Sequence, residues 1–176
     1  MVSMKGNEAD TSSVDSLIKA LKSKDGLVRQ KARNALVRIG EPASDALVKA
    51  FEDKSDVMHW EVAKALSQIG NAKAAKTLIQ ALEDKEFSVR WIGAEGLIHI
   101  GQAGVQALLK ALIERPDSVW LREGAHHVLH DLIHKKLIDA ATREQLTPVL
   151  EAINHLDPVT ETNAAARKAL DKLEDG

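Results

Sequence analysis

The sequence predicts an all-α protein, a right-handed solenoid of about five stacked helical hairpins. Short apolar segments with helical spacing recur along the chain, and an Asp-containing break follows each. A longer helical segment comes after each break, and three of these segments end in Ile-Gly, at Gly40, Gly70 and Gly101. Aromatic residues make up only 3% of the chain, so the core must consist of small aliphatic side chains that let helices pack closely. A single hairpin cannot bury its apolar face alone, which is why stacking is expected.

The hairpins can be followed in order along the chain. Glycine directly after a helix can adopt the positive φ that satisfies the last carbonyls, so the three Ile-Gly pairs are expected helix ends. Residues 135–139 indicate an extended helix end plus an insertion, and Pro148 is expected in the first turn of the next helix. We expect a disordered tail over residues 1–13, then one domain over residues 14–174, with repeats at about 14–43, 44–74, 75–104, 105–140 and 141–174.

Composition and charge exclude several classes of protein. The net charge of -2 argues against non-specific nucleic-acid binding, which needs a positive surplus. The chain has no cysteine, which excludes disulfides and thiolate metal sites. The polar start does not resemble a signal peptide, and no uninterrupted apolar run approaches the roughly 20 residues of a membrane span. We therefore expect a cytoplasmic protein that binds neither nucleic acid nor membrane.

Residues 28–40 and 89–101 carry a family resemblance. Both begin with Val-Arg, continue with a helical apolar pattern and end in Ile-Gly, and they resemble the HEAT-like repeat in the branch shared with phycobilisome lyase subunits. This resemblance implies that the second helices line the concave side. It also implies an Arg ladder, here Arg29, Arg90 and Arg122, in which each Arg pairs with an Asp of a nearby break. We expect Arg90 and Arg122 to hydrogen-bond acidic or backbone acceptors in the breaks between helices. Asp84 and Asp117 are the candidate acceptors, and His59 replaces the Arg in the second repeat.

All three tryptophans fall on one predicted surface. When the repeats are aligned by their Leu and Ile positions, Trp60, Trp91 and Trp120 lie on the stripe of the second helices that the core does not need. Tryptophans gathered on one exposed surface are typical of binding sites. The alternative is that each ring fills a gap between repeats, and the sequence leaves both possibilities open.

Histidines and carboxylates are expected close to the tryptophans. The same alignment places Glu95, His99, Glu123, His127 and Asp131 in rows across the concave groove, which also holds Glu61. Separately, His126, His130 and His134 are spaced four residues apart, a spacing at which two histidines can share a metal ion. We interpret His126 as packed between repeats, and the other two as facing the insertion.

The sequence favours a non-catalytic interaction module or scaffold without a cofactor. We expect its concave groove to bind a protein or peptide, with a basic segment, through Trp60, Trp91, Trp120, Glu95, His99, Glu123, His127 and Asp131. The alternative is a metal- or small-molecule-dependent activity at the Glu/His/Asp cluster. The di-iron chemistry of deoxyhypusine hydroxylase, a HEAT-like enzyme, is not carried over. Its His-Glu pairs correspond here to Gln30-Lys31, Trp60-Glu61, Trp91-Ile92 and Glu123-Gly124.

Overall fold

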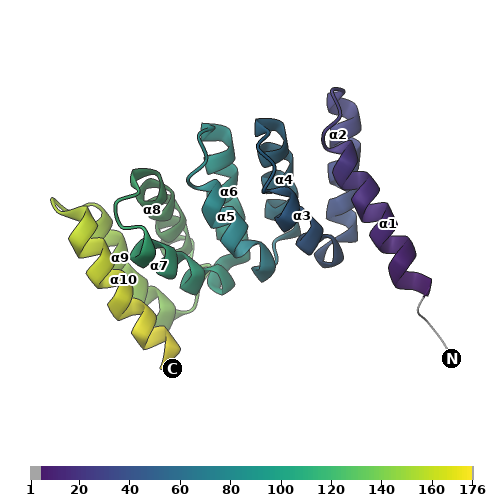
Figure 1. Ribbon diagram of the computed structural model, residues 1–176. Helices are drawn as coiled ribbons and strands as arrows, with labels where there is room; N and C mark the ends of the chain where they lie inside the picture. Colours follow the sequence, from purple (N-terminus) through teal and green to yellow (C-terminus); the bar gives the residue numbers. More distant parts are fainter. Residues whose placement is uncertain (1–4, 176) are drawn as a thin grey trace.

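Helix pairs joined by short loops make up the chain in a computed structural model that describes residues 5–175 (Figure 1). No strand occurs within these residues, so the prediction of an all-α solenoid is confirmed. Single 3₁₀ turns precede the second, third and fourth hairpins. The five hairpins are α1 (Lys5–Ala20) with α2 (Gly26–Ile39), α3 (Ser44–Ala50) with α4 (Asp56–Ile69), α5 (Ala75–Ala81) with α6 (Phe87–Ile100), α7 (Val105–Glu114) with α8 (Val119–His134), and α9 (Ala140–Ile153) with α10 (Pro158–Glu174).

Local capping signals set most helix boundaries. Side-chain oxygens of Asp25 and Ser118 accept hydrogen bonds from the first-turn amides of α2 and α8, which satisfies donors that a helix start leaves unpaired. At the other end, α2, α4 and α6 stop at Gly40, Gly70 and Gly101, whose φ angles are 75°, 65° and 65°. The predicted glycine ends are therefore confirmed.

Two element boundaries differ from the prediction. Helix α1 begins at Lys5, so residues 5–13 are helical rather than a disordered tail, and residues 1–4 lie outside the described residues. Residues 7–13 contain neither proline nor glycine, so nothing interrupts the helix before Val14. Helix α9 begins at Ala140, which places Pro148 inside it rather than in its first turn. The reason is the cap at Asp139, whose carboxylate accepts hydrogen bonds from the amide and hydroxyl of Thr142.

The fifth hairpin is reversed relative to the first four. In those, the first helices α1, α3, α5 and α7 form one layer, and the second helices α2, α4, α6 and α8 form another (Figure 1). In the fifth hairpin the first helix, α9, packs on α8, and the second helix, α10, packs on α7. The connecting loop contains Lys136 with a φ of 55°, and the Asp139 amide donates to the Gln102 side chain at 3.2 Å. The chain thus stays in the second layer, and this hairpin closes the core.

An aliphatic core runs continuously through the stack. Its largest fully buried side chains are leucines, among them Leu36, Leu66, Leu97 and Leu121, together with Met58. Close approach is possible where α6 carries Gly93, because a Cβ at that position would lie 2.8 Å from the carbonyl oxygen of Leu78. The longer second helices also make more extensive contacts with one another than the first helices do.

One stretch, Phe87–Glu114, is long and apolar enough to cross a membrane by length and composition alone. The structure divides this stretch into α6 and α7, with a break at Gly101. Its apolar side chains, among them Val89, Leu97 and Leu108, lie in the core between hairpins. Buried core helices pass the same compositional test, so the stretch is explained by its packing.

Candidate binding site between α6 and α8

The Arg ladder organises the edge of the stack at which the candidate site lies. In three repeats an arginine Nη1 donates to the backbone carbonyl oxygen six residues upstream: Arg29 to Ser23, Arg90 to Asp84, and Arg122 to Pro116. The expectation that Arg90 and Arg122 contact acidic or backbone acceptors in the breaks is therefore confirmed. The acceptors are backbone carbonyls, not the Asp side chains that the resemblance implies, and Pro116 rather than Asp117 serves Arg122. Each arginine ties the loop within its hairpin to the first turn of the second helix.

The second repeat replaces this tie with a contact between repeats. His59 Nδ1 lies 2.6 Å from Asp84 Oδ2 in the next hairpin, and its ring stacks on Phe51 at a centroid distance of 4.6 Å. Asp84 also accepts from the Glu86 amide at 2.8 Å. The exception at His59 thus joins the second and third hairpins through the same loop that holds Arg90.

The prediction that Glu61 lies in the groove is wrong. The Glu61 side chain is buried, and its carboxylate forms ion pairs with Arg29, at 3.0 Å, and with Arg33. The aligned position is the same as in other repeats, but two arginines of α2, in the preceding repeat, cover it. Glu61 therefore joins the first two hairpins and is not available to a partner.

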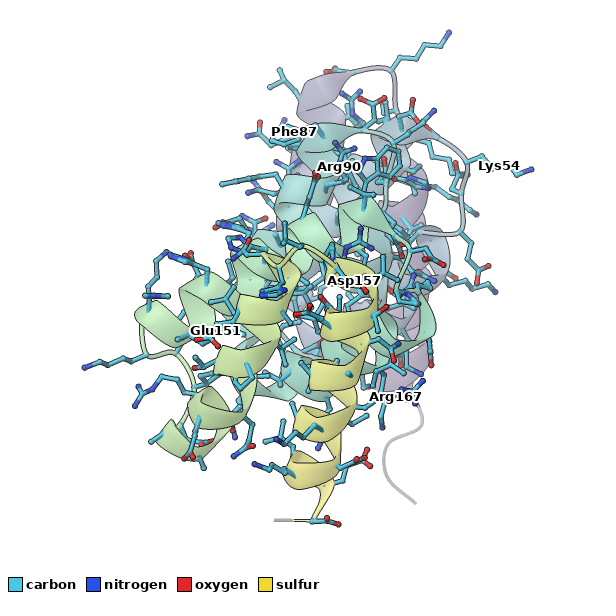
Figure 2. All side chains as sticks on the ribbon, turned by 90° about the vertical axis from the view of Figure 1, so that its left-hand side faces the viewer. Lys54, Phe87, Arg90, Glu151, Asp157 and Arg167 are labelled. Atoms are coloured by element: carbon cyan, nitrogen blue, oxygen red, sulfur yellow. The ribbon has the colours of Figure 1, made fainter. Side chains whose placement is uncertain are left out.

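A pocket of about 180 Å³ opens between α6 and α8. Its walls combine apolar rings with three ionisable groups, and Gly124 allows α8 to come close to Leu82 at the pocket floor. In Figure 2, Phe87 and Arg90 lie close together near the upper end of the molecule, where α6 begins. The lining residues are Leu82, Phe87, Arg90, Trp91, Ala94, Trp120, Glu123, Gly124 and His127.

Neighbouring side chains hold both tryptophan rings of this pocket in place. The Trp91 ring stacks on His127 with centroids 4.8 Å apart, and His127 Nε2 lies 3.2 Å from Glu95 Oε1. The Arg90 guanidinium lies 4.7 Å from the Trp120 ring centroid, a cation–π distance. Trp91 nevertheless remains 49% exposed and Trp120 43% exposed. The rings are therefore positioned in advance but still accessible, which reduces the entropy lost on binding.

Four predicted site residues do not line this pocket; Glu95 lies beside it, and the other three have partners elsewhere. Trp60 is half-buried against the core, with the Arg33 guanidinium 5.1 Å from its ring centroid. His99 Nδ1 lies 2.8 Å from the Ser67 carbonyl oxygen. Asp131 is buried, and one of its carboxylate oxygens lies 2.6 Å from Lys135 Nζ. The structure thus brings together Trp91, Trp120, Glu123 and His127, with Glu95 beside them.

This distribution also separates the members of the Glu/His/Asp cluster. Only Glu95 and His127 are in direct contact, while His99 and Asp131 have partners of their own. Across residues 5–175, no three His, Asp or Glu side chains have the geometry to hold a metal ion together. The pocket combines apolar surface with one exposed carboxylate, Glu123, an arrangement suited to binding.

Two important pocket residues were not singled out from the sequence. Phe87 is 67% exposed although it is one of only two phenylalanines in the chain. Arg90 was assigned to the ladder alone, yet its guanidinium lies 5.6 Å from the Phe87 centroid and also contacts Trp120. The sequence signal that could have identified Phe87 was its position at the expected start of a helix, three residues before the ladder arginine Arg90.

Comparison with known proteins identifies the type of repeat. No curated protein matches the chain. Three crystal structures of engineered proteins are similar to this chain. The first has 21% identity and a TM-score of 0.42, and the match covers 95% of this chain and 81% of the engineered protein. For the second and third, the identities are 23% and 21% and the TM-scores 0.45 and 0.44; each match covers 96% of this chain, and 49% and 84% of the respective engineered protein. A family model described as HEAT repeats matches residues 44–130, the second to fourth hairpins, and nothing found supports the narrower phycobilisome lyase branch. With its helical architecture, the chain is an all-α solenoid of HEAT-like repeats.

Proposed function

We propose that this solenoid is a non-catalytic interaction module whose pocket between α6 and α8 binds a protein segment. The segment places an apolar side chain in the pocket and a neighbouring Lys or Arg beside Glu123. The observation that carries the proposal is the pair of half-exposed rings, Trp91 and Trp120, held in place around one cavity. HEAT repeats generally serve as protein-interaction scaffolds, which supports this class of function.

The size of the pocket favours a side chain over a small-molecule ligand. Sites for drug-sized ligands usually enclose about 300–1,000 Å³, whereas this pocket encloses about 180 Å³. Its apolar walls, which include Leu82 and Trp91, suit an aliphatic or aromatic group. One anchoring side chain of a longer segment fits that space.

The charges around the pocket indicate where a basic residue would bind. The Arg90 guanidinium already forms part of the wall and disfavours a second cation deep in the pocket. Glu123 is exposed and makes no hydrogen bond or ion pair with any other described residue. A cation at the rim would therefore contact Glu123. Glu95 adds a second carboxylate, since it contacts His127, which lines the same pocket. Because this contact is exposed, it contributes mainly to association rate and specificity and weakens with salt.

Peptide selection tests this proposal. A random peptide library would be selected on the wild type, without depletion on any pocket variant. We expect enriched peptides to carry a large apolar residue next to Lys or Arg. Each single Trp substitution should weaken binding about thirtyfold, as truncation of an interface hot spot does. Glu123→Lys should weaken binding mainly at low salt.

The matched control is Glu52→Lys, which reverses an exposed charge in the loop between α3 and α4, outside the two hairpins that line the pocket. Its affinity for the selected peptides should equal that of the wild type. Enrichment of acidic peptides, or unchanged affinity in both single Trp variants, would contradict the proposed mode of binding.

A further inference from the structure

Three histidines lie one turn apart along α8, outside the pocket. The rings of His126 and His130 stack with centroids 6.2 Å apart, and those of His130 and His134 stack with centroids 4.1 Å apart. His130 and His134 are both exposed. The proposed interaction module uses neither of them, so their close stacking calls for a separate explanation.

Hydrogen bonds select the same tautomer for His130 and His134. His130 Nδ1 lies 3.3 Å from Asp131 Oδ1, and His134 Nδ1 lies 2.8 Å from the backbone oxygen of His130. Ionised carboxylate and carbonyl oxygens only accept hydrogen bonds, so each Nδ1 must carry the proton. In the neutral ring this leaves the Nε2 lone pair available. Metal-binding histidines have this pattern, with one ring nitrogen donating to a carboxylate or carbonyl while the other binds the ion.

We propose that His130 and His134 bind one divalent transition-metal ion, such as Zn²⁺, through their two Nε2 atoms. Tetrahedral coordination with Zn–N distances near 2.0–2.1 Å places the two nitrogens about 3.3 Å apart. The rings stack with centroids 4.1 Å apart and only 20° from parallel, and each Nε2 lone pair lies in the plane of its ring. Both side chains must therefore turn out of this stack before the two lone pairs can converge on one ion. Water molecules or a partner's side chain complete the coordination, because both rings face solvent.

The surroundings favour this pair over the pair formed by His126 and His130. His126 is half-buried and its ring is farther from His130. Lys135 places an ammonium group near the site, but that group lies 2.6 Å from Asp131 Oδ2, which offsets its charge. Asp131 thereby orients His130 through one oxygen and neutralises Lys135 through the other.

Calorimetric titration of the untagged full chain with Zn²⁺ at neutral pH tests the site. We expect one ion per chain, with no binding of Mg²⁺, which prefers oxygen ligands. His130→Ala and His134→Ala should each weaken Zn²⁺ binding by at least about tenfold, because the second ligand no longer acts intramolecularly. Asp131→Ala should weaken it by about tenfold or more, the effect typical of removing a group that orients a metal ligand.

His126→Ala on the same helix is the control, and its affinity for Zn²⁺ should match the wild type. Circular dichroism without metal should show the same helix content in every variant, so that a loss of binding reports the site itself. The assignment is overturned if millimolar Zn²⁺ produces no binding, or if His126→Ala loses as much affinity as His134→Ala. Binding that survives both His130→Ala and His134→Ala would also overturn it.

Discussion

Replacing Glu61 by Ala should strongly destabilise the N-terminal half of the solenoid. The Glu61 side chain is 5% exposed, and its carboxylate pairs with Arg29 and Arg33 of the neighbouring α2. Those arginine side chains are only 24% and 12% exposed, so the substitution leaves two poorly solvated cations facing each other. The loss is therefore larger than that of a surface ion pair.

The structure allows an estimate of the magnitude. Removing one partner of a buried ion pair costs about 3–5 kcal/mol of unfolding free energy. Arg29 keeps its hydrogen bonds to the Ser23 and Lys24 carbonyl oxygens, which places the expected loss near the lower end of that range. A loss of about 3 kcal/mol corresponds to a melting temperature lower by roughly 6–12 °C for a chain of this size.

Thermal and urea unfolding followed by circular dichroism would measure this loss. Glu123→Ala is the matched control, because Glu123 is exposed and its removal should change stability by less than about 0.5 kcal/mol. Glu61→Gln, which keeps the shape but not the charge, should fall between the two. If Glu61→Ala were as stable as Glu123→Ala, the buried pairing with Arg29 and Arg33 would be refuted.

Two further predictions concern packing and pH. Gly93→Ala should lower the free energy of unfolding, measured in urea, by about 1–3 kcal/mol, because the added Cβ would lie 2.8 Å from the Leu78 carbonyl oxygen. Gly104→Ala is the control: its added Cβ would lie no closer than 3.5 Å to any neighbouring atom, so we expect no comparable loss. Hydrogen bonding to Lys135 lowers the pKa of Asp131 below its ordinary value. The ionised carboxylate therefore stabilises the folded state at pH values above the unfolded pKa of about 3.9. This contribution is lost as the pH falls through the folded-state pKa. The destabilisation by Asp131→Asn at neutral pH should therefore disappear in acid, and equal destabilisation at both pH values would contradict that reasoning.

Local signals made most of the fold predictable from the sequence. Gly40, Gly70 and Gly101 mark helix ends because each must adopt a positive φ there, a requirement visible without knowing any tertiary contact. The ladder arginines were expected from the family resemblance, and the contacts they make are local, since each reaches a backbone carbonyl only six residues upstream. Because these features depend only on residues close in the chain, they recur wherever the repeat motif recurs.

Features that depend on contacts between repeats were harder to predict. Glu61 lies at a groove position by alignment, but Arg29 and Arg33 of the preceding repeat cover it. The reversal of the fifth hairpin depends on the path of one loop, which includes Lys136 at positive φ. In the pocket, Trp91 and Trp120 had been singled out from the sequence, whereas Phe87, the third aromatic ring of the wall, became evident only from its exposure.

The alternative roles of the tryptophans, binding or packing, can be separated by one comparison. The Trp91→Ala/Trp120→Ala variant would be melted beside the wild type, and the affinity of both for a selected apolar-basic peptide would be measured. Because both rings are about half exposed, the loss of stability per ring should stay well below the about 3–5 kcal/mol of a buried Trp. The affinity should fall by at least about thirtyfold. A large loss of stability with unchanged peptide affinity would contradict the account, because it would make Trp91 and Trp120 packing residues.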